Sequence, residues 1–351
     1  MKTFGILMPG SINFNFNESV ILTKKNCTIY SHINLNEFIS STHDFKVAVY
    51  DSRPSSIDIK SLPKCDYIII HNMEFHEIDL AAVNKLQNFN IVFSINGIVH
   101  KNLNCKIITS LEWLSSTVHP YKNELKSRLE SLNCFEEKPL YFDFLPGRPN
   151  LHKKLVAKYI KQSQLEHKFL SSDFFSEYGS EKPRSFNPIL WDEELANFDY
   201  NSSSHVALDN INLVSSQIIP VKIYNNTCYS IVAETTARNS YAFYTEKVVK
   251  PMLAKRLFVV FAGKHYLKGL KDLGFRTFDE IIDESYDNIQ DDEIRWRMAF
   301  DQVEFLCNQP QKEILTKIMP IVIHNYRHSL NYNWVRNLNY TIEDLFTTLI
   351  Q

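Results

Sequence analysis

Three neighbouring residues in the C-terminal half could together bind a ligand that is both an anion and a polyol. Thr245, Glu246 and Lys247 belong to the run FYTEKVVKP, residues 243–251. Thr245 can cap a helix whose unpaired backbone N–H groups attract phosphate, and Lys247 adds positive charge in its first turn. Glu246 can accept hydrogen bonds from two vicinal hydroxyls. Nucleotide sugars carry both phosphate groups and vicinal hydroxyls. The alternative interpretation of these three residues is an ordinary capped surface helix with an acid in its first turn.

The segments around this run have a characteristic order. An apolar run ending in acid, 229–234, comes before it, and a second apolar run with a glycine, 257–263, comes after it. Residues 274–278 and the acidic DESYD, 283–287, follow. This order resembles the donor-binding half of GT-B glycosyltransferases, especially fucosyltransferase-like and exostosin-like enzymes and their phage relatives. The resemblance implies two Rossmann-like parallel-sheet domains facing each other across a cleft, with a UDP- or GDP-linked sugar as co-substrate.

The resemblance also implies roles for other residues. Glu234, Arg238 and Tyr241 precede the run, and an acid or asparagine at this place in related enzymes faces the sugar. An exposed polar loop is the alternative. The strand-to-helix turn GRPNLHKK, 147–154, resembles the stretch that opens the donor domain, where an arginine contacts the diphosphate. Arg148 is the expected contact and Lys153 the second choice, because a glycine turn with positive charge at a helix start suits phosphate. A solvated basic helix start is the alternative.

A glycosyltransferase that inverts the configuration at the anomeric carbon of the sugar needs a base beside the acceptor hydroxyl. His71, Glu74 and His76 follow the expected strand 67–70, so their loop should reach the ligand crevice at the carboxyl ends of the strands. Asp51 and Asn13 follow two other expected strands and are candidates for binding the acceptor. A retaining mechanism would need no such base, and each residue could equally be an ordinary surface residue of its loop.

One local feature is awkward for the helix after Thr245. Pro251 lies inside it, where proline costs about 3 kcal/mol, so the helix either bends there or begins near Lys250. The resembling enzymes commonly share this Lys-Pro pair.

No metal or other cofactor is expected. The sequence has no Asp-x-Asp motif and no His/Cys cluster, and the acids of 283–287 are most simply helix caps. GT-B enzymes generally use positive side chains and helix dipoles where other transferases use a divalent ion.

Short apolar runs alternate with amphipathic stretches, which predicts an α/β protein with parallel sheets. Strands are expected at 4–8, 47–50, 67–70, 91–95, 107–108, 140–145, 168–170, 221–224, 229–232, 257–261 and 276–278. Helices are expected at 152–160, 292–307, 312–326 and 341–350, and residues 171–204 are expected to form a long loop with one short helix at 192–196. We expect an acceptor domain at 1–135, a donor domain at 136–330, and a helix at 331–351 that crosses back to the first domain.

Composition limits the class of protein. A chain of 351 residues with 44% hydrophobic and 22% charged residues is an ordinary globular protein, long enough for two domains. Its longest apolar runs are strand-sized, so no membrane span is expected. The six cysteines lie far apart, which favours reduced thiols and a cytoplasmic protein.

The acceptor stays open between a glycan and a hydroxymethylated base in phage DNA. The formal net charge of −2 argues against broad, non-specific binding of nucleic acid. Arg327, Arg336 and the helix at 153–161 could nevertheless form a basic rim around the expected cleft. Two other classes are weighed against the transferase. One is a non-catalytic nucleotide- or sugar-binding protein, and the other is a dehydrogenase, whose Gly-rich fingerprint this chain lacks.

Overall fold

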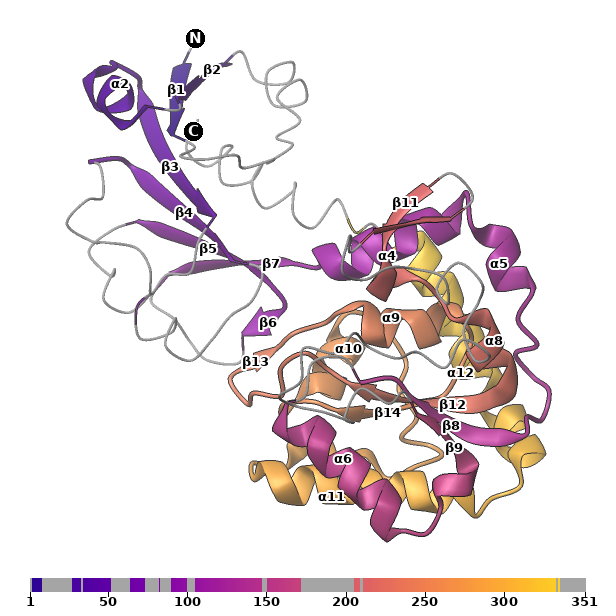
Figure 1. Ribbon diagram of the computed structural model, residues 1–351. Helices are drawn as coiled ribbons and strands as arrows, with labels where there is room; N and C mark the ends of the chain where they lie inside the picture. Colours follow the sequence, from indigo (N-terminus) through magenta and orange to yellow (C-terminus); the bar gives the residue numbers. More distant parts are fainter. Residues whose placement is uncertain are drawn as a thin grey trace, which may run out of the picture. The chain divides into compact units, whose positions relative to one another are not determined.

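The computed structural model describes residues 2–7, 27–32, 34–51, 64–72, 82, 90–99, 105–146, 150–171, 205–208, 211–332 and 334. These fall into two compact units: the described residues up to 112 together with residue 334 form the first, and those from 113 to 332 form the second (Figure 1). The expected returning helix at 341–350 and the short helix at 192–196 lie outside the described residues.

The first unit contains a six-stranded parallel sheet. Its order is β2 (Cys27–His32), β1 (Lys2–Leu7), β3 (Phe45–Asp51), β4 (Tyr67–Asn72), β5 (Ile91–Asn96) and β7 (Lys106–Ser110). Consecutive residues of β4, Ile68 to Ile70, are all buried, so the strand is covered on both faces. All five strands expected here are confirmed, whereas β2 was not predicted. Helix α2 (Leu35–Ser40) and the short β6 (Ile98–Val99) complete the described elements.

The second unit contains a four-stranded parallel sheet in the order β14 (Phe258–Phe261), β12 (Thr227–Ala233), β8 (Leu140–Phe144) and β9 (Phe169–Ser171). Helices α6 (Leu151–Gln162) and α11 (Asp292–Cys307) lie on one face. Helix α9 (Glu246–Leu253) covers the other face, and α12 (Gln311–Asn331) packs on α9 (Figure 1). Parallel strands covered by helices confirm the predicted α/β class.

Shorter elements surround this sheet. They are α4 (Glu112–Lys122), α5 (Lys126–Glu130), the hairpin β10 (His205–Leu208) and β11 (Ile211–Val214), α8 (Val221–Asn226), β13 (Tyr241–Ala242), α10 (Tyr266–Asp272) and the 3-10 turns η3 (Glu166–Lys168), η4 (Ser215–Gln217) and η5 (Glu284–Asn288). The backbone N–H of Ile219 donates to the Tyr121 hydroxyl at 2.6 Å, which ties α4 to the segment before α8. The second unit therefore begins before residue 136, the start expected from the sequence.

Two expected strands are wrong. Residues 221–224 belong to helix α8, which starts directly after Pro220, a residue whose fixed φ suits a helix start. Residues 276–278 form no strand, because the Asn325 side chain replaces a neighbouring strand. Its amide accepts from Arg276 N–H and donates to Arg276 C=O, both at 2.8 Å.

A buried ion pair fixes the centre of the second sheet. The Arg256 guanidinium donates to Asp143 of β8 at 2.8 Å, to the Thr227 and Ser230 hydroxyls of β12, and to the Tyr224 carbonyl of α8. Arg256 is 5% exposed and Asp143 3% exposed, so both charges depend on these partners. The network holds β8, β12 and α8 in one arrangement.

None of the described helices is long and apolar enough to cross a membrane. Five described cysteines, Cys65, Cys105, Cys134, Cys228 and Cys307, carry free thiols, as the sequence predicted.

Candidate functional site

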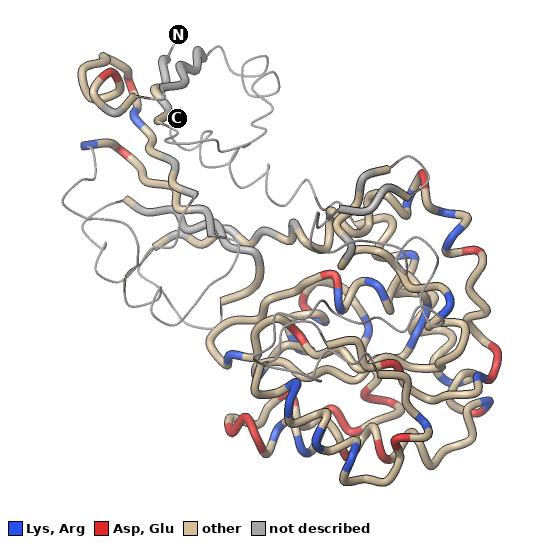
Figure 2. Tube along the Cα trace, viewed as in Figure 1, with Lys and Arg blue, Asp and Glu red and all other residues tan. Residues whose placement is uncertain are grey.

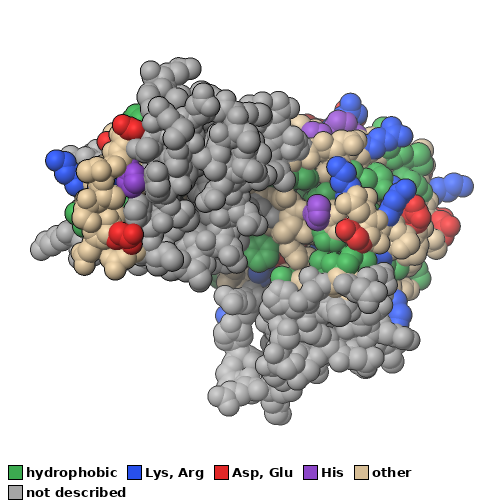
Figure 3. Space-filling model, turned by 90° about the horizontal axis from the view of Figure 1, so that it is seen from above, with side chains coloured by type: hydrophobic (Ala, Val, Ile, Leu, Met, Phe, Trp, Pro, Cys, Tyr) green, Lys and Arg blue, Asp and Glu red, His purple; other side chains and the backbone are tan. Residues whose placement is uncertain are grey.

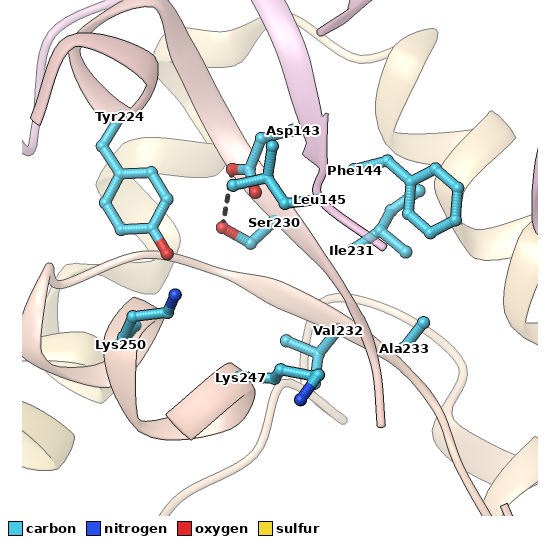
Figure 4. A pocket seen from close by; sticks show the side chains of 10 residues that line it. All are labelled: Asp143, Phe144, Leu145, Tyr224, Ser230, Ile231, Val232, Ala233, Lys247 and Lys250. Atoms are coloured by element: carbon cyan, nitrogen blue, oxygen red, sulfur yellow. Dashed lines mark hydrogen bonds between the residues drawn. The ribbon is translucent and has the colours of Figure 1, made fainter. Parts of the chain in front are cut away.

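The second sheet has a topological switch point between β8 and β12. The chain leaves β8 through α6 to reach β9 on one side, and leaves β12 through α9 to reach β14 on the other. In open α/β sheets, ligands bind beyond the carboxyl ends of the strands at this point. A pocket lies there, lined by residues 143–145 of β8 and its end, 230–233 of β12, Tyr224 of α8, and Lys247 and Lys250 of α9 (Figure 4).

Helix α9 begins as the sequence predicted. Thr245 has extended backbone angles, and its Oγ1 accepts a hydrogen bond from Lys247 N–H at 3.3 Å, so it is the N-cap. The helix then runs without a break from Glu246 to Leu253 with Pro251 inside it. The option of a start near Lys250 is therefore wrong.

Glu246 and Lys247 form an ion pair at the start of α9. The Lys247 Nζ lies 2.7 Å from Glu246 Oε1 and also donates to the Thr235 hydroxyl at 3.1 Å. Glu246 is 6% exposed. Burial by itself would raise the pKa of this carboxyl, but Lys247 and Lys250 outweigh it, and the pKa is lowered. The first turn of α9 therefore carries an anion and a cation side by side.

Glu234 holds this helix start in place. Its carboxylate accepts from the Thr245 N–H at 3.2 Å, the Thr245 hydroxyl at 2.6 Å and the Tyr266 hydroxyl at 2.5 Å. The side chain is 0% exposed, and burial raises its pKa. In this arrangement Glu234 positions the cap of α9 and has no exposed surface with which to face a sugar.

The start of α6 meets the same loop. The His152 Nε2 lies 2.8 Å from the Glu234 carbonyl, and the Asn150 side-chain amide donates to the Thr235 carbonyl at 2.5 Å. His152 is 3% exposed, and burial lowers its pKa to about 4, so the ring is neutral and donates from Nε2. The N-termini of α6 and α9 thus converge on residues 234–235.

Of the two basic residues that the sequence offers at the turn before α6, the structure describes only Lys153, and it does not line the pocket. Lys153 is 2% exposed and does not present its ammonium at the surface. Arg148 lies outside the described residues.

The loop between β12 and α9 packs closely on the turn after β14. Tyr241 is buried and its ring stacks on Phe243 at 5.7 Å, so it supports the loop from inside. A Cβ added to Gly263 would collide with the Arg238 carbonyl, which explains the glycine there. Arg238 itself is partly exposed on this loop.

Two candidate residues of the first unit, Asp51 and His71, belong to strands near the switch point of its sheet. Strand β1 pairs with β2 on one side and β3 on the other, so the crevice is expected beyond β1 and β3. Asp51 ends β3 and is the register partner of His71 on β4. Asn13, Glu74 and His76 lie outside the described residues.

Of the two arginines proposed for a basic rim, Arg327 is exposed on α12, and Arg336 lies outside the described residues.

Sequence reasoning missed Lys250, His152, Tyr224 and Asn150. Lys250 had a signal, because it follows Lys247 by one helical turn and so shares its face of α9. The other three are recognisable only once α6 and α8 are placed against the loop after β12.

Among the described residues, no group of three or more His, Cys, Asp or Glu side chains is placed to hold a metal ion. Comparison with known proteins assigns no family: no family model matches the chain, and no curated protein or solved structure is significantly similar to it.

Proposed function

We propose that the second unit binds a nucleoside diphosphate sugar and that the protein is a glycosyltransferase of the GT-B type. The observation that carries the proposal is the pocket at the β8/β12 switch point, which Lys247 lines, with Thr245 and Glu246 next to it at the start of α9. These are the residues of the run that resembles the donor site of such enzymes. The same residues combine a phosphate-binding helix start with a carboxylate suited to hydroxyls.

The ion pair suggests how donor binding proceeds. A diphosphate at the start of α9 would compete with Glu246 for the Lys247 ammonium, which now lies 2.7 Å from the carboxylate. The Glu246 oxygen released from that pair would accept from the vicinal hydroxyls of the ribose. The cation and the helix dipole would then neutralise the departing nucleoside diphosphate, so the reaction needs no divalent ion.

The first unit would supply the acceptor side. Asp51 and His71 stand in register on neighbouring parallel strands, at the carboxyl edge of the sheet. An inverting transferase needs a base at the acceptor hydroxyl, and we propose His71, Glu74 or His76 for this role.

Calorimetry with UDP- and GDP-sugars tests the donor site. Glu246→Ala should weaken binding by about 1–3 kcal/mol, because the ribose hydroxyls lose a buried acceptor. Glu280→Ala, at an exposed acid of the same unit, is the matched control and should bind as the wild type does. Equal affinity of the Glu246→Ala variant, with the fold intact by circular dichroism, would remove the assignment.

A DNA acceptor is the second candidate, and the exposed face of α6 favours it. Lys154, Lys158 and Lys161 are exposed on that helix, which has no acidic residue, and basic residues follow its length in Figure 2. Seen from above, however, the described surface carries Lys and Arg among apolar side chains, without one continuous basic face (Figure 3). A glycan acceptor is the simpler alternative.

Salt dependence separates the two acceptors. On duplex DNA the logarithm of the binding constant should fall with log salt at about −0.9 per phosphate contacted, and we expect about two to four phosphates. Charge reversal at Lys158 or Arg327 should weaken DNA binding and leave donor binding unchanged. If no association with plain or hydroxymethylated DNA is detected at low salt, the DNA acceptor is excluded.

A further inference from the structure

Lys250 is the cation of the pocket that the sequence motif leaves unassigned. Its Nζ donates to the Ser216 carbonyl at 2.8 Å, a neutral partner. Across the described part of the chain, no carboxylate lies within ion-pair distance of this ammonium, whereas the neighbouring Lys247 is paired with Glu246. Because that pair carries no net charge, a net positive charge at the pocket depends on Lys250.

The placement of Lys250 suits a ligand in the pocket. It lies one helical turn after Lys247, so both side chains leave the same face of α9 and both line the pocket. Figure 4 shows the Lys250 ammonium pointing toward the hydroxyl end of Tyr224, across from the ends of β8 and β12. Ser230 on the far wall is held by Asp143 through a 2.8 Å hydrogen bond. Ser230 is thus fixed in the pocket wall, and among the charged lining residues Asp143 and Lys247 are in ion pairs, whereas Lys250 forms none with the residues that the structure describes.

We propose that Lys250 binds a phosphoryl group of the ligand together with Lys247, and that it is the residue that selects an anion for this pocket. The inference rests on the proposed nucleoside diphosphate site and names a second phosphate-binding residue in it. The first turn of α9 alone offers a cation already neutralised by a neighbouring acid. Two ammonium groups on one face can bind a diphosphate at two points.

The surroundings of Lys250 couple ligand binding to proton uptake. Burial lowers the pKa of Lys250 to about 8, with Lys247 acting in the same direction and Glu246 and Asp143 opposing it. Tyr224 also faces it from α8, and Ser216 from η4. At pH 8 about half of the Lys250 side chains are therefore neutral, and a bound phosphoryl anion would favour the charged form. Binding should then take up about half a proton at pH 8 and almost none at pH 6.5.

The test is calorimetry with inorganic pyrophosphate, which needs neither the base nor the sugar. Titrations at pH 8 in buffers of different ionisation enthalpy give the number of protons taken up. Lys250→Arg keeps a charge that does not titrate, so it should bind pyrophosphate but lose the uptake of about half a proton. The difference between the two proteins cancels the ionisation of pyrophosphate itself. Lys250→Met should bind at least about tenfold more weakly.

Lys268→Met is the matched control, because Lys268 is an exposed lysine paired with Asp272, and it should change neither quantity. Three results would each overturn the inference. They are an unchanged affinity for pyrophosphate in Lys250→Met, the same proton uptake in Lys250→Arg as in the wild type, and no binding of pyrophosphate to the wild type. If nucleotide sugars bind but Lys250→Met has no effect, the proposed function stands without this role. If pyrophosphate binds as expected but no nucleotide sugar does, Lys250 keeps its role and the proposed function fails.

Discussion

Replacing His152 with glutamine should make the second unit less sensitive to acid. The His152 ring is buried against Trp296, with ring centroids 5.5 Å apart, and donates to the Glu234 carbonyl. Burial lowers its pKa from 6.5 to about 4, with the nearby Lys153 and Lys247 acting in the same direction. The folded protein therefore favours the neutral ring. This contribution to stability is complete above pH 6.5 and is lost as the pH falls toward 4.

The loss of stability in acid follows from the difference between the ordinary pKa of histidine and the pKa of His152 in the folded protein. About 2.5 pH units at 1.36 kcal/mol per unit correspond to about 3.4 kcal/mol in the free energy of unfolding. Over this range the wild type should lose about 1.4 kcal/mol per pH unit through this one residue. A glutamine amide can donate to the same carbonyl but does not titrate, so the variant should lack this part of the acid dependence.

Urea unfolding at several pH values between 7 and 4.5 measures the effect. The stability advantage of the wild type over His152→Gln should shrink steadily as the pH falls. His167→Gln, at an exposed histidine of η3, should follow the wild type throughout. If His152→Gln shows the same acid dependence as the wild type, the ring is not held neutral by its site, and our reading of the α6 start is refuted.

Three further outcomes are expected. Gly263→Ala should destabilise the fold by about 1–3 kcal/mol in thermal or urea unfolding and weaken nucleotide-sugar binding, because its methyl group must displace the Arg238 carbonyl; an unchanged unfolding midpoint would contradict this. Burial raises the pKa of Glu284 from 4.5 to about 6, so the wild type should lose about 2 kcal/mol as the pH rises through this range, and Glu284→Gln should not. As the pH rises, His152 adds stability and Glu284 removes it. Each contribution is therefore measured by comparing its own variant with the wild type. Chelation with EDTA should leave the proposed transferase activity intact, and loss of activity that manganese or magnesium restores would show that a metal site exists.

The sequence predicted the strands that are buried on both faces. Runs such as 67–70 and 257–261 are continuously apolar because residues on both faces of these parallel strands are buried, and this pattern is visible without a structure. The errors arose where a short apolar run had no such context. The run at 221–224 is apolar because Ile223 and Tyr224 are buried residues of a helix, and four residues cannot separate the two periodicities.

The start of α9 was predicted from the sequence because its signals are local. A cap and the two charges after it are local in sequence, so Thr245, Glu246 and Lys247 could be recognised from their spacing. The role of Glu234 depends on Tyr266, which lies far along the chain, and the role of His152 depends on the carbonyl of Glu234. Such long-range hydrogen bonds leave no periodic signal. A buried carboxylate that positions a helix cap therefore looks, in the sequence, like an acid available to a ligand.

The charged residues around the pocket are of two kinds: those in ion pairs, and Lys250, whose charge changes with pH. Asp143 and Arg256 form a buried ion pair, so they fix the shape of the pocket wall and add no net charge. Glu246 and Lys247 cancel at the start of α9. What remains is Lys250, whose pKa of about 8 lies close to physiological pH. We infer that the attraction of the pocket for an anion depends on this one ammonium. Small changes in pH should therefore alter how much ligand is bound more than they would if an arginine, which stays charged, stood at this position.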